Sequence, residues 1–206
     1  MNKKKEIAVA KQSTSAENIE HQFYEVHERD RYAALKRIID YNPDIFGIVF
    51  CRTRWETQEI AEKLMKDGYN ADALHGDLSQ AQRDNVMKRY RGKSLQMLVA
   101  TDVAARGIDV NNVTHVLNYN LPDDPEIYTH RSGRTARAGK SGVSIVIVNT
   151  REVNKIRQLE RIIDKKFEKA KIPGAFEICE KQLFHLVNKI HDIKVNSEDI
   201  FQFLRC

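Results

Sequence analysis

Short apolar runs alternate with amphipathic stretches along most of the chain, and polar or glycine-containing segments separate them. The run over residues 45–51 is apolar throughout, which is typical of a strand buried on both faces of a parallel sheet. Shorter runs of the same kind cover residues 71–74, 95–100, 113–119 and 142–148. Residues 21–27 alternate in character and predict one more strand, at an edge of the sheet.

Apolar residues at helical spacing fill the intervals between these strands. Residues 30–41 place Leu35, Ile38 and Ile39 on one face, and Asp30 is the expected N-cap. Helices are also predicted over residues 53–67, 79–90 and the stretch that contains residues 130–139. Strands alternating with helices over about 120 residues predict an α/β domain with a parallel sheet and right-handed crossovers.

The two ends of the chain differ from this pattern. Residues 1–19 are polar with few apolar residues, so we expect a partly disordered linker before a domain over residues 20–171. Residues 150–171 predict one long amphipathic helix, with Val153, Ile156, Leu159, Ile163 and Phe167 near one face. After a break at Pro173, an apolar stripe at Leu183, Leu186, Val187 and Ile190 and a short segment at 200–204 predict a helical extension over residues 172–206.

Composition narrows the class of protein. The chain is 41% hydrophobic and 31% charged, as in an ordinary globular domain, and its net charge of +5 favours a phosphate-bearing partner. Cys51, Cys179 and Cys206 are far apart and form no Cys-x-x-Cys pair, which argues against a disulfide framework or a zinc site and indicates the cytoplasm. No run approaches the roughly 20 apolar residues of a membrane span, so no membrane partner is expected.

The stretch from His130 to Gly139 carries three arginines, Arg131, Arg134 and Arg137, at intervals of three residues. On one or two helical turns their side chains would point to one side. Because guanidinium groups suit phosphate oxygens, the stretch predicts a receptor for a polyanion. The alternative is a solvated basic helix end.

Polar residues also follow the predicted strands directly. Thr53 follows one strand, Gly76 and Asp77 the next, and Thr101 and Asp102 the third. Because ligands of open parallel sheets collect at the carboxyl ends of the strands, these are candidate binding residues.

Four of these stretches together, residues 49–54, 80–83, 101–109 and 130–139, resemble in order and spacing the motifs of the second RecA-like domain of DEAD-box RNA helicases. The resemblance covers about residues 20–170. It implies a RecA-like three-layer α/β domain, with a mostly parallel sheet flanked by helices, as one half of an ATP-dependent RNA helicase. His130 favours the RNA branch, because related DNA helicases generally have glutamine there.

The resemblance also implies roles at the nucleotide. Arg134 and Arg137 match the arginines that contact the γ-phosphate of ATP, and Asp109 matches the residue that accepts hydrogen bonds from the ribose. Gly107 would permit a tight backbone there, while His130 and Arg131 would couple the ATP site to the partner domain. Alternatively, one of the arginines pairs with an acidic neighbour such as Asp109.

For RNA, the resemblance nominates Thr53, Gly76, Arg83 and Thr101 as phosphate contacts. Hydroxyls, one guanidinium and backbone amides hold phosphates without reading bases, so binding should be largely independent of sequence. The alternative for Thr53 and Thr101 is a role as helix caps.

The first half of an ATPase site is absent from the sequence. Gly92-Lys93-Ser94 and Gly139-Lys140-Ser141 look like the end of a P-loop, but Met87 and Arg134 occupy the positions of its other glycine. No Asp-Glu-Ala-Asp stretch is present to hold Mg²⁺, which we assign to an N-terminal RecA-like domain. The chain therefore looks like the C-terminal half of a helicase that begins in the interdomain linker, and we expect it to be inactive alone.

The C-terminal region leaves several interpretations open. The basic side of residues 150–171 is either a solvated face or an RNA-binding surface. The extension over residues 172–206 resembles the start of the C-terminal extension of bacterial cold-shock type DEAD-box helicases. It would dimerise the protein, fold back on the core, or be part of a longer domain. A non-catalytic interaction module and the half of a DNA helicase are the competing functions.

Overall fold

The computed structural model describes residues 18–108, 110 and 112–192. Seven strands form one sheet in the order β3-β4-β2-β5-β6-β1-β7, and every neighbouring pair is parallel. The strands are β1 (Ile19–Glu25), β2 (Gly47–Phe50), β3 (Ala71–Leu74), β4 (Met97–Ala100), β5 (His115–Asn118), β6 (Gly142–Val148) and β7 (Glu168–Ala170). The predicted parallel α/β fold is confirmed.

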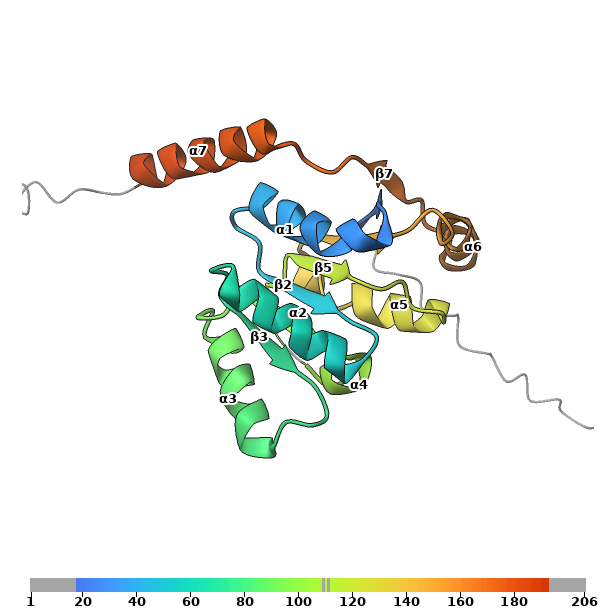
Figure 1. Cartoon of the computed structure of the whole chain (residues 1–206), viewed down its shortest axis with the longest axis horizontal. Helices are drawn as coiled ribbons and strands as arrows, with labels where there is room; N and C mark the ends of the chain where they lie inside the picture. Colours follow the sequence, from blue (N-terminus) through green and yellow to red (C-terminus); the bar gives the residue numbers. More distant parts are fainter. Residues whose placement is uncertain (1–17, 109, 111, 193–206) are drawn as a thin grey trace, which may run out of the picture.

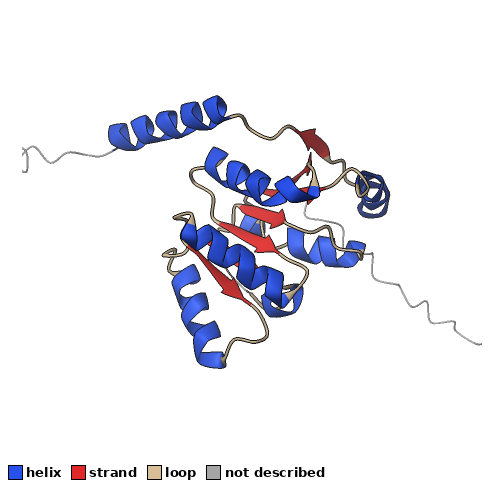
Figure 2. Ribbon diagram, in the orientation of Figure 1, coloured by secondary structure: helices blue, strands red, loops and turns tan. Residues whose placement is uncertain are grey.

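Helices cover both faces of the sheet and produce three layers (Figures 1 and 2). They are α1 (Arg31–Tyr41), α2 (Arg54–Lys66), α3 (Gln80–Arg91), α4 (Asp102–Ala105), α5 (Pro125–Ser132), α6 (Val153–Ile163) and α7 (Ala175–Asp192), with 3₁₀ turns at Glu28–Asp30 and Arg137–Gly139. Helices α1 and α2 pack on one face, whereas α3, α4, α5 and α6 pack on the other.

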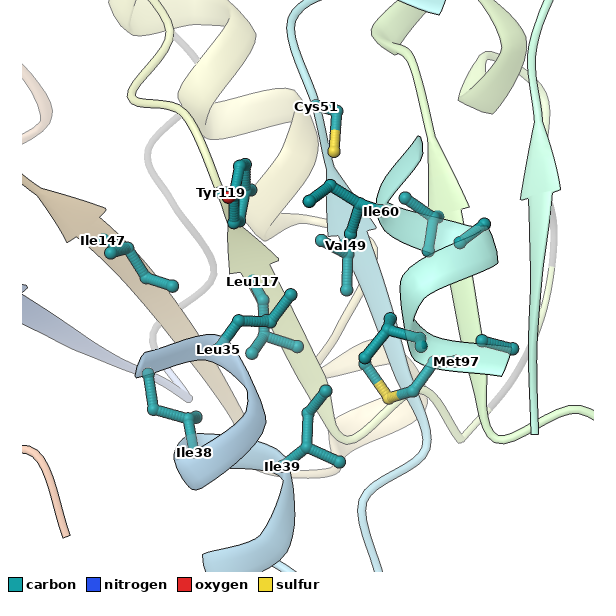
Figure 3. Packing of buried hydrophobic residues seen from close by; sticks show 14 of the residues in the cluster. Leu35, Ile38, Ile39, Val49, Cys51, Ile60, Met97, Leu117, Tyr119 and Ile147 are labelled. Atoms are coloured by element: carbon teal, nitrogen blue, oxygen red, sulfur yellow. The ribbon is translucent and has the colours of Figure 1, made fainter. Parts of the chain in front are cut away.

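The apolar run of β2 explains why both faces are filled. Val49 packs under α1 and α2 with Met97 and Leu117 of the neighbouring strands (Figure 3). Ile48 and Phe50 point to the opposite face and pack against α3 and α4. Because successive strand residues alternate between faces, a strand covered on both sides has to be apolar at every position.

Side-chain caps start four of the helices, including α5, where Asp124 Oδ1 accepts the Glu126 amide at 2.8 Å. Thr53 Oγ1 accepts the Glu56 amide at 3.1 Å, and Thr101 Oγ1 accepts the Ala104 amide at 3.4 Å. Ser79 forms a capping box with Gln82. Asp30 occupies the predicted N-cap position of α1, but its side chain makes no capping bond, because a 3₁₀ turn over Glu28–Asp30 leads directly into the helix.

Two predictions about the flanks of the sheet are wrong. Strand β1 is interior, since it pairs with β6 on one side and β7 on the other. The single helix predicted over residues 150–171 ends at Ile163, where Asp164 adopts a left-handed conformation (φ 53°) that aspartate tolerates better than most residues. Phe167 then enters the core beside Tyr128, and β7 follows on the free side of β1.

Helix α7 contacts α1, and polar groups link it to α1 and to the turn that follows α1 (Figure 1). Gln182 Nε2 donates to the Asp40 carbonyl at 2.9 Å, and His185 Nδ1 lies 3.1 Å from Asp44 Oδ2. The predicted apolar stripe of Leu183, Leu186, Val187 and Ile190 is more than half exposed. Residues 193–206, including the predicted segment 200–204, lie outside the described residues, as do residues 1–17 of the predicted linker.

No helix in the described part of the chain is long and apolar enough to span a membrane. Within the same part, Cys51 is a buried free thiol and Cys179 an exposed one.

Candidate functional site

The four residues nominated for RNA lie near the carboxyl ends of β2, β3 and β4. Thr53 and Gly76 are exposed, whereas Thr101 is buried and its amide is bonded to the Leu74 carbonyl at the end of β3. Arg83, on α3, directs Nη2 towards the Ala104 carbonyl of α4 at 3.5 Å. Thr53 and Thr101 both act as helix caps, and the Thr53 hydroxyl does so while remaining at the surface.

The turn that contains Gly76 is held against α2 by contacts that the sequence did not reveal. Arg54 forms an ion pair with Asp77, and the His75 ring bonds Gln58 Oε1 through Nε2 at 2.9 Å. The Asp77 amide donates to His75 Nδ1 at 3.3 Å. Since Nδ1 accepts a hydrogen bond, the ring hydrogen is on Nε2 and is donated to Gln58. The polar position after β3 was the only signal available for these contacts.

Arg131 does not face outward with the other two arginines, contrary to the prediction for this stretch. Its Nε and Nη2 donate to the two carboxylate oxygens of Asp102 at 2.6 and 2.8 Å. Nη1 donates to Asn118 Oδ1 and to the Asn120 carbonyl, at 3.0 and 2.8 Å. The residue is only 3% exposed. Because α5 ends at Ser132, the three arginines do not share a continuous helix and need not point to one side.

Arg134 and Arg137 reach the opposite edge of the sheet, although binding residues were expected at its carboxyl ends. Both line a hollow of about 350 Å³ beside Phe46, Thr114 and Ser141, which precede β2, β5 and β6 directly. Arg134 Nη1 donates to the Ile108 carbonyl at 2.9 Å, and Arg137 Nε to that of Gly133 at 3.2 Å. The two arginines lie at the amino edge because α5, which follows β5, runs back across the sheet to that edge.

The same hollow brings together the two Gly-Lys-Ser stretches that failed the P-loop pattern. Lys93 and Lys140 both line it with the two arginines, and Asp44 adds one carboxylate. Four cationic side chains facing one acidic group make the hollow suited to an anion such as a phosphate chain. Lys93 and Lys140 were missed because they lie 47 positions apart in the sequence.

A second hollow, of about 400 Å³, lies between α4 and α5. Phe50, Ala105 and Ile127 give it apolar walls, and Arg106 and His130 are exposed beside them. Arg134 lines this hollow as well as the first. The Arg134 side chain therefore lines both hollows, one at each edge of the sheet.

Contacts at the starts of β5 and β6 fix the turn after α5. Thr135 Oγ1 donates to the Val113 carbonyl at 2.5 Å, and Ala136 adopts a left-handed conformation with φ 56°. A Cβ at Gly142 would lie 2.1 Å from Thr135 Oγ1, so only glycine leaves room for this turn. The turn sets the direction in which Arg134 and Arg137 leave the core.

A buried polar chain anchors α5 on the sheet. His21 Nδ1 lies 2.6 Å from the Tyr128 hydroxyl, which donates to Ser144 Oγ at 3.0 Å. Burial, assisted by nearby Lys165, lowers the pKa of His21 to about 4, so the ring is neutral near pH 7. Burial also raises the pKa of the Tyr128 hydroxyl, which keeps it a hydrogen-bond donor.

Gly107 has φ 74°, a left-handed conformation that glycine adopts without strain, in the turn after α4. Asp109 lies outside the described residues. Within residues 18–108, 110 and 112–192, no cluster of three or more histidine, cysteine or acidic residues is placed to hold a metal ion.

Comparison with known proteins places the chain among helicases. The helicase conserved C-terminal domain family matches residues 30–139, and the helical domain of probable ATP-dependent RNA helicases matches residues 178–205. The DEAD-box ATP-dependent RNA helicase CshA of Geobacillus kaustophilus is 40% identical over 205 residues, covering 100% of this chain and 44% of that protein. The chain spans less than half the length of this and the other curated relatives that it matches.

Solved structures agree on the fold. A DEAD box protein from Methanococcus jannaschii, 48% identical, superposes with a TM-score of 0.70 over 75% of this chain and 42% of that chain. Dbp5 of Saccharomyces cerevisiae, in a structure bound to RNA and ADP BeF₃, is 28% identical and has a TM-score of 0.73 over 82% of this chain and 45% of its own.

Proposed function

This chain belongs to the DEAD-box RNA helicase family as a helicase C-terminal domain, and we propose that it supplies half of an ATPase site and part of an RNA groove to an ATP-dependent RNA helicase. The observation that carries the proposal is the separation of its candidate residues between two edges of one sheet. The polar caps lie at the carboxyl ends of β2 and β4, and the arginine pair lies in a cationic hollow at the amino ends. One rigid domain thereby presents both surfaces.

In the proposed ATPase site, Arg134 and Arg137 stabilise the charge that develops on the phosphoryl group. When bound, ATP would supply the phosphoryl group that is transferred, and an N-terminal RecA-like domain would hold the Mg²⁺. The cationic lining of the hollow fits a phosphate chain. Asp109 contacts the ribose and Gly107 permits the turn. His130 couples the site to the partner domain from its exposed position, and Arg131 contributes by holding α5 to Asp102.

In the proposed RNA groove, Thr53, Gly76, Arg83 and Thr101 hold phosphates of a single strand. The Thr53 hydroxyl and the Gly76 backbone are exposed at the edge where this strand would pass. Contacts of this kind read no bases, so affinity should fall with salt and depend little on sequence. The domain, residues 20–171, then works with its N-terminal partner in the cytoplasm.

The test is ATPase activity after mixing the chain, or fusing it, with a DEAD-box N-terminal domain, with and without RNA. We expect RNA-stimulated turnover in the mixture or fusion and none from the chain alone. Arg137→Ala should lower turnover by roughly 10³-fold or more, because an arginine at a transferring phosphoryl group contributes about that much. Arg151→Ala, an exposed arginine after β6, is the matched control and should have no effect.

Turnover by the chain alone would show that the site is complete within it. A fusion that folds and binds RNA but never hydrolyses ATP would favour a non-catalytic interaction module instead.

The extension, residues 172–206, is proposed as a dimerisation element. The supporting observation is that α7 turns polar groups towards α1 and leaves its apolar stripe exposed. A second copy of the same stripe would cover it. Light scattering across a concentration series should give a dimer mass that Leu186→Glu reduces to the monomer, whereas a constant monomer mass in the unmodified chain would end this proposal.

A further inference from the structure

Trp55 is the single tryptophan of the chain and it is 74% exposed. Among the described residues outside α7, no phenylalanine or tyrosine side chain is exposed. Tryptophan is highly buried on average and is enriched at interfaces, so its exposure beside a candidate binding edge is the starting point for a contact at this position.

The position of Trp55 on α2 follows from the helix itself. It is the second residue of α2, so it lies at the carboxyl end of β2. The buried face of the helix is formed by Thr57, Ile60 and Leu64. At 3.6 residues per turn Trp55 lies on the opposite side, and its ring projects from the domain surface.

Trp55 has two of the proposed phosphate contacts as neighbours. Thr53 is two residues before it, at the cap of the same helix. Gln58, one turn further along the same side of α2, holds His75 and with it the turn of Gly76. Arg54, adjacent to Trp55 in the chain, forms the ion pair with Asp77 in that turn. The indole is therefore beside the proposed path of the RNA backbone.

A similar arrangement occurs on the adjacent strand. Val103 is the second residue of α4, follows the Thr101 cap, and is also 74% exposed. Strands β2 and β4 are paired, and α2 and α4 pack on opposite faces of the sheet. An exposed apolar side chain thus flanks the row of polar caps on each side.

We propose that Trp55 is a stacking platform for one base of the single-stranded RNA whose phosphates lie at Thr53 and Gly76. The inference rests on the proposed RNA groove and adds a base subsite to it. Hydroxyls and backbone amides fix phosphates only, whereas an aromatic face stacks on any base and preferentially on the larger purines. Arg52 and Arg54, which flank the Thr53 cap, are exposed cationic residues, and each has a carboxylate partner, Asp123 at 3.8 Å and Asp77 respectively.

The fluorescence of Trp55 can report base stacking directly, because this residue is the single tryptophan of the chain. The fluorescence of the chain is titrated at low salt with oligoadenylate, oligouridylate and an abasic oligonucleotide of the same length. Binding is measured independently by anisotropy of the labelled strand. The variants are Trp55→Ala, Trp55→Phe and, as a matched control at the far end of α2, Met65→Ala, whose residue is 43% exposed.

We expect quenching by both RNAs, stronger with adenylate, and none by the abasic strand. Trp55→Ala should weaken oligoadenylate binding roughly tenfold, the size of one lost base stack, and should not change binding of the abasic strand. Trp55→Phe should restore part of the affinity, and Met65→Ala should match the unmodified chain.

RNA that binds Trp55→Ala as tightly as the unmodified chain, without quenching the latter, would overturn the base subsite and leave the phosphate groove intact. If no labelled strand binds either the chain or its fusion to an N-terminal domain, the groove itself is wrong and the subsite with it.

Discussion

Arg131 and Asp102 form a two-pronged ion pair, with nitrogen–oxygen distances of 2.6 and 2.8 Å, across 29 positions of sequence. The pair joins α5 to the start of α4 immediately after β4. Because Arg131 is almost fully buried, the pair fixes the helix that carries the other arginines, rather than offering a charge to a ligand.

Arg131→Ala should therefore act on stability first. Removing one partner leaves Asp102 and Asn118 without their donor, and we expect a loss of about 3 kcal/mol in the free energy of unfolding. Urea titration measures this change. Arg137→Ala, which keeps this pair, should unfold at nearly the unmodified urea concentration. Equal stability of both variants would contradict the structural role of Arg131.

Replacing Ala136 by glycine should stabilise the chain. The left-handed backbone at this position, φ 56°, costs an alanine about 1 kcal/mol that glycine avoids, and the greater freedom of unfolded glycine offsets part of the gain. We expect the free energy of unfolding, measured by thermal denaturation, to rise by about 0.5 kcal/mol. The same change at Ala33, inside α1, should instead destabilise by about 1 kcal/mol.

Gly142→Ala should disrupt the turn that directs Arg134 and Arg137. The new methyl group would lie 2.1 Å from Thr135 Oγ1 and 2.8 Å from the Ala136 amide nitrogen, so the turn has to move. We expect a loss of about 1–3 kcal/mol in stability together with reduced ATPase activity in the fusion. At Gly76 the nearest atom to an added Cβ is 3.7 Å away, and Gly76→Ala should leave stability nearly unchanged.

Acid should destabilise the fold through the buried His21 and the half-buried His115. Burial lowers the pKa of His21 and of His115 to about 4, below the usual value near 6.5. Their neutral forms support folding above pH 6.5, and this stability is lost as pH falls from 6.5 towards 4. Each accounts for roughly 2 kcal/mol between pH 7 and pH 5.

Urea unfolding measured from pH 7 to pH 5 checks this dependence. His21→Gln and His115→Gln should each reduce the change in the free energy of unfolding between pH 7 and pH 5, and the double variant should reduce it further. An acid profile identical in all four proteins would contradict the burial of the two rings.

Much of the fold could be predicted because its signals are local. Continuous apolar runs identified the buried strands, and Thr53 and Thr101 at the start of helical patterns identified caps that the structure contains. The long helix over residues 150–171 failed because its apolar spacing persists beyond Asp164, where the backbone turns to place β7 beside β1. That pairing is decided by a strand 146 residues earlier in the chain.

The candidate site was predicted less well for the same reason. Arg131, Arg134 and Arg137 are the same residue type at equal spacing, and only the fold separates the buried one from the other two. What distinguishes Arg131 is that it donates to both carboxylate oxygens of Asp102. Lys93 and Lys140 enter the same hollow only because the turns before β4 and β6 meet at the amino edge of the sheet.

Strand β7 also affects how the molecule can associate. It has only three residues, and Lys169 on it pairs with Glu25 of β1, so the sheet ends in a short, charged border. Such a border is a poor template for a strand from another molecule and protects against amyloid-like stacking. Contact between copies on this side of the domain therefore has to use helices rather than an extended sheet.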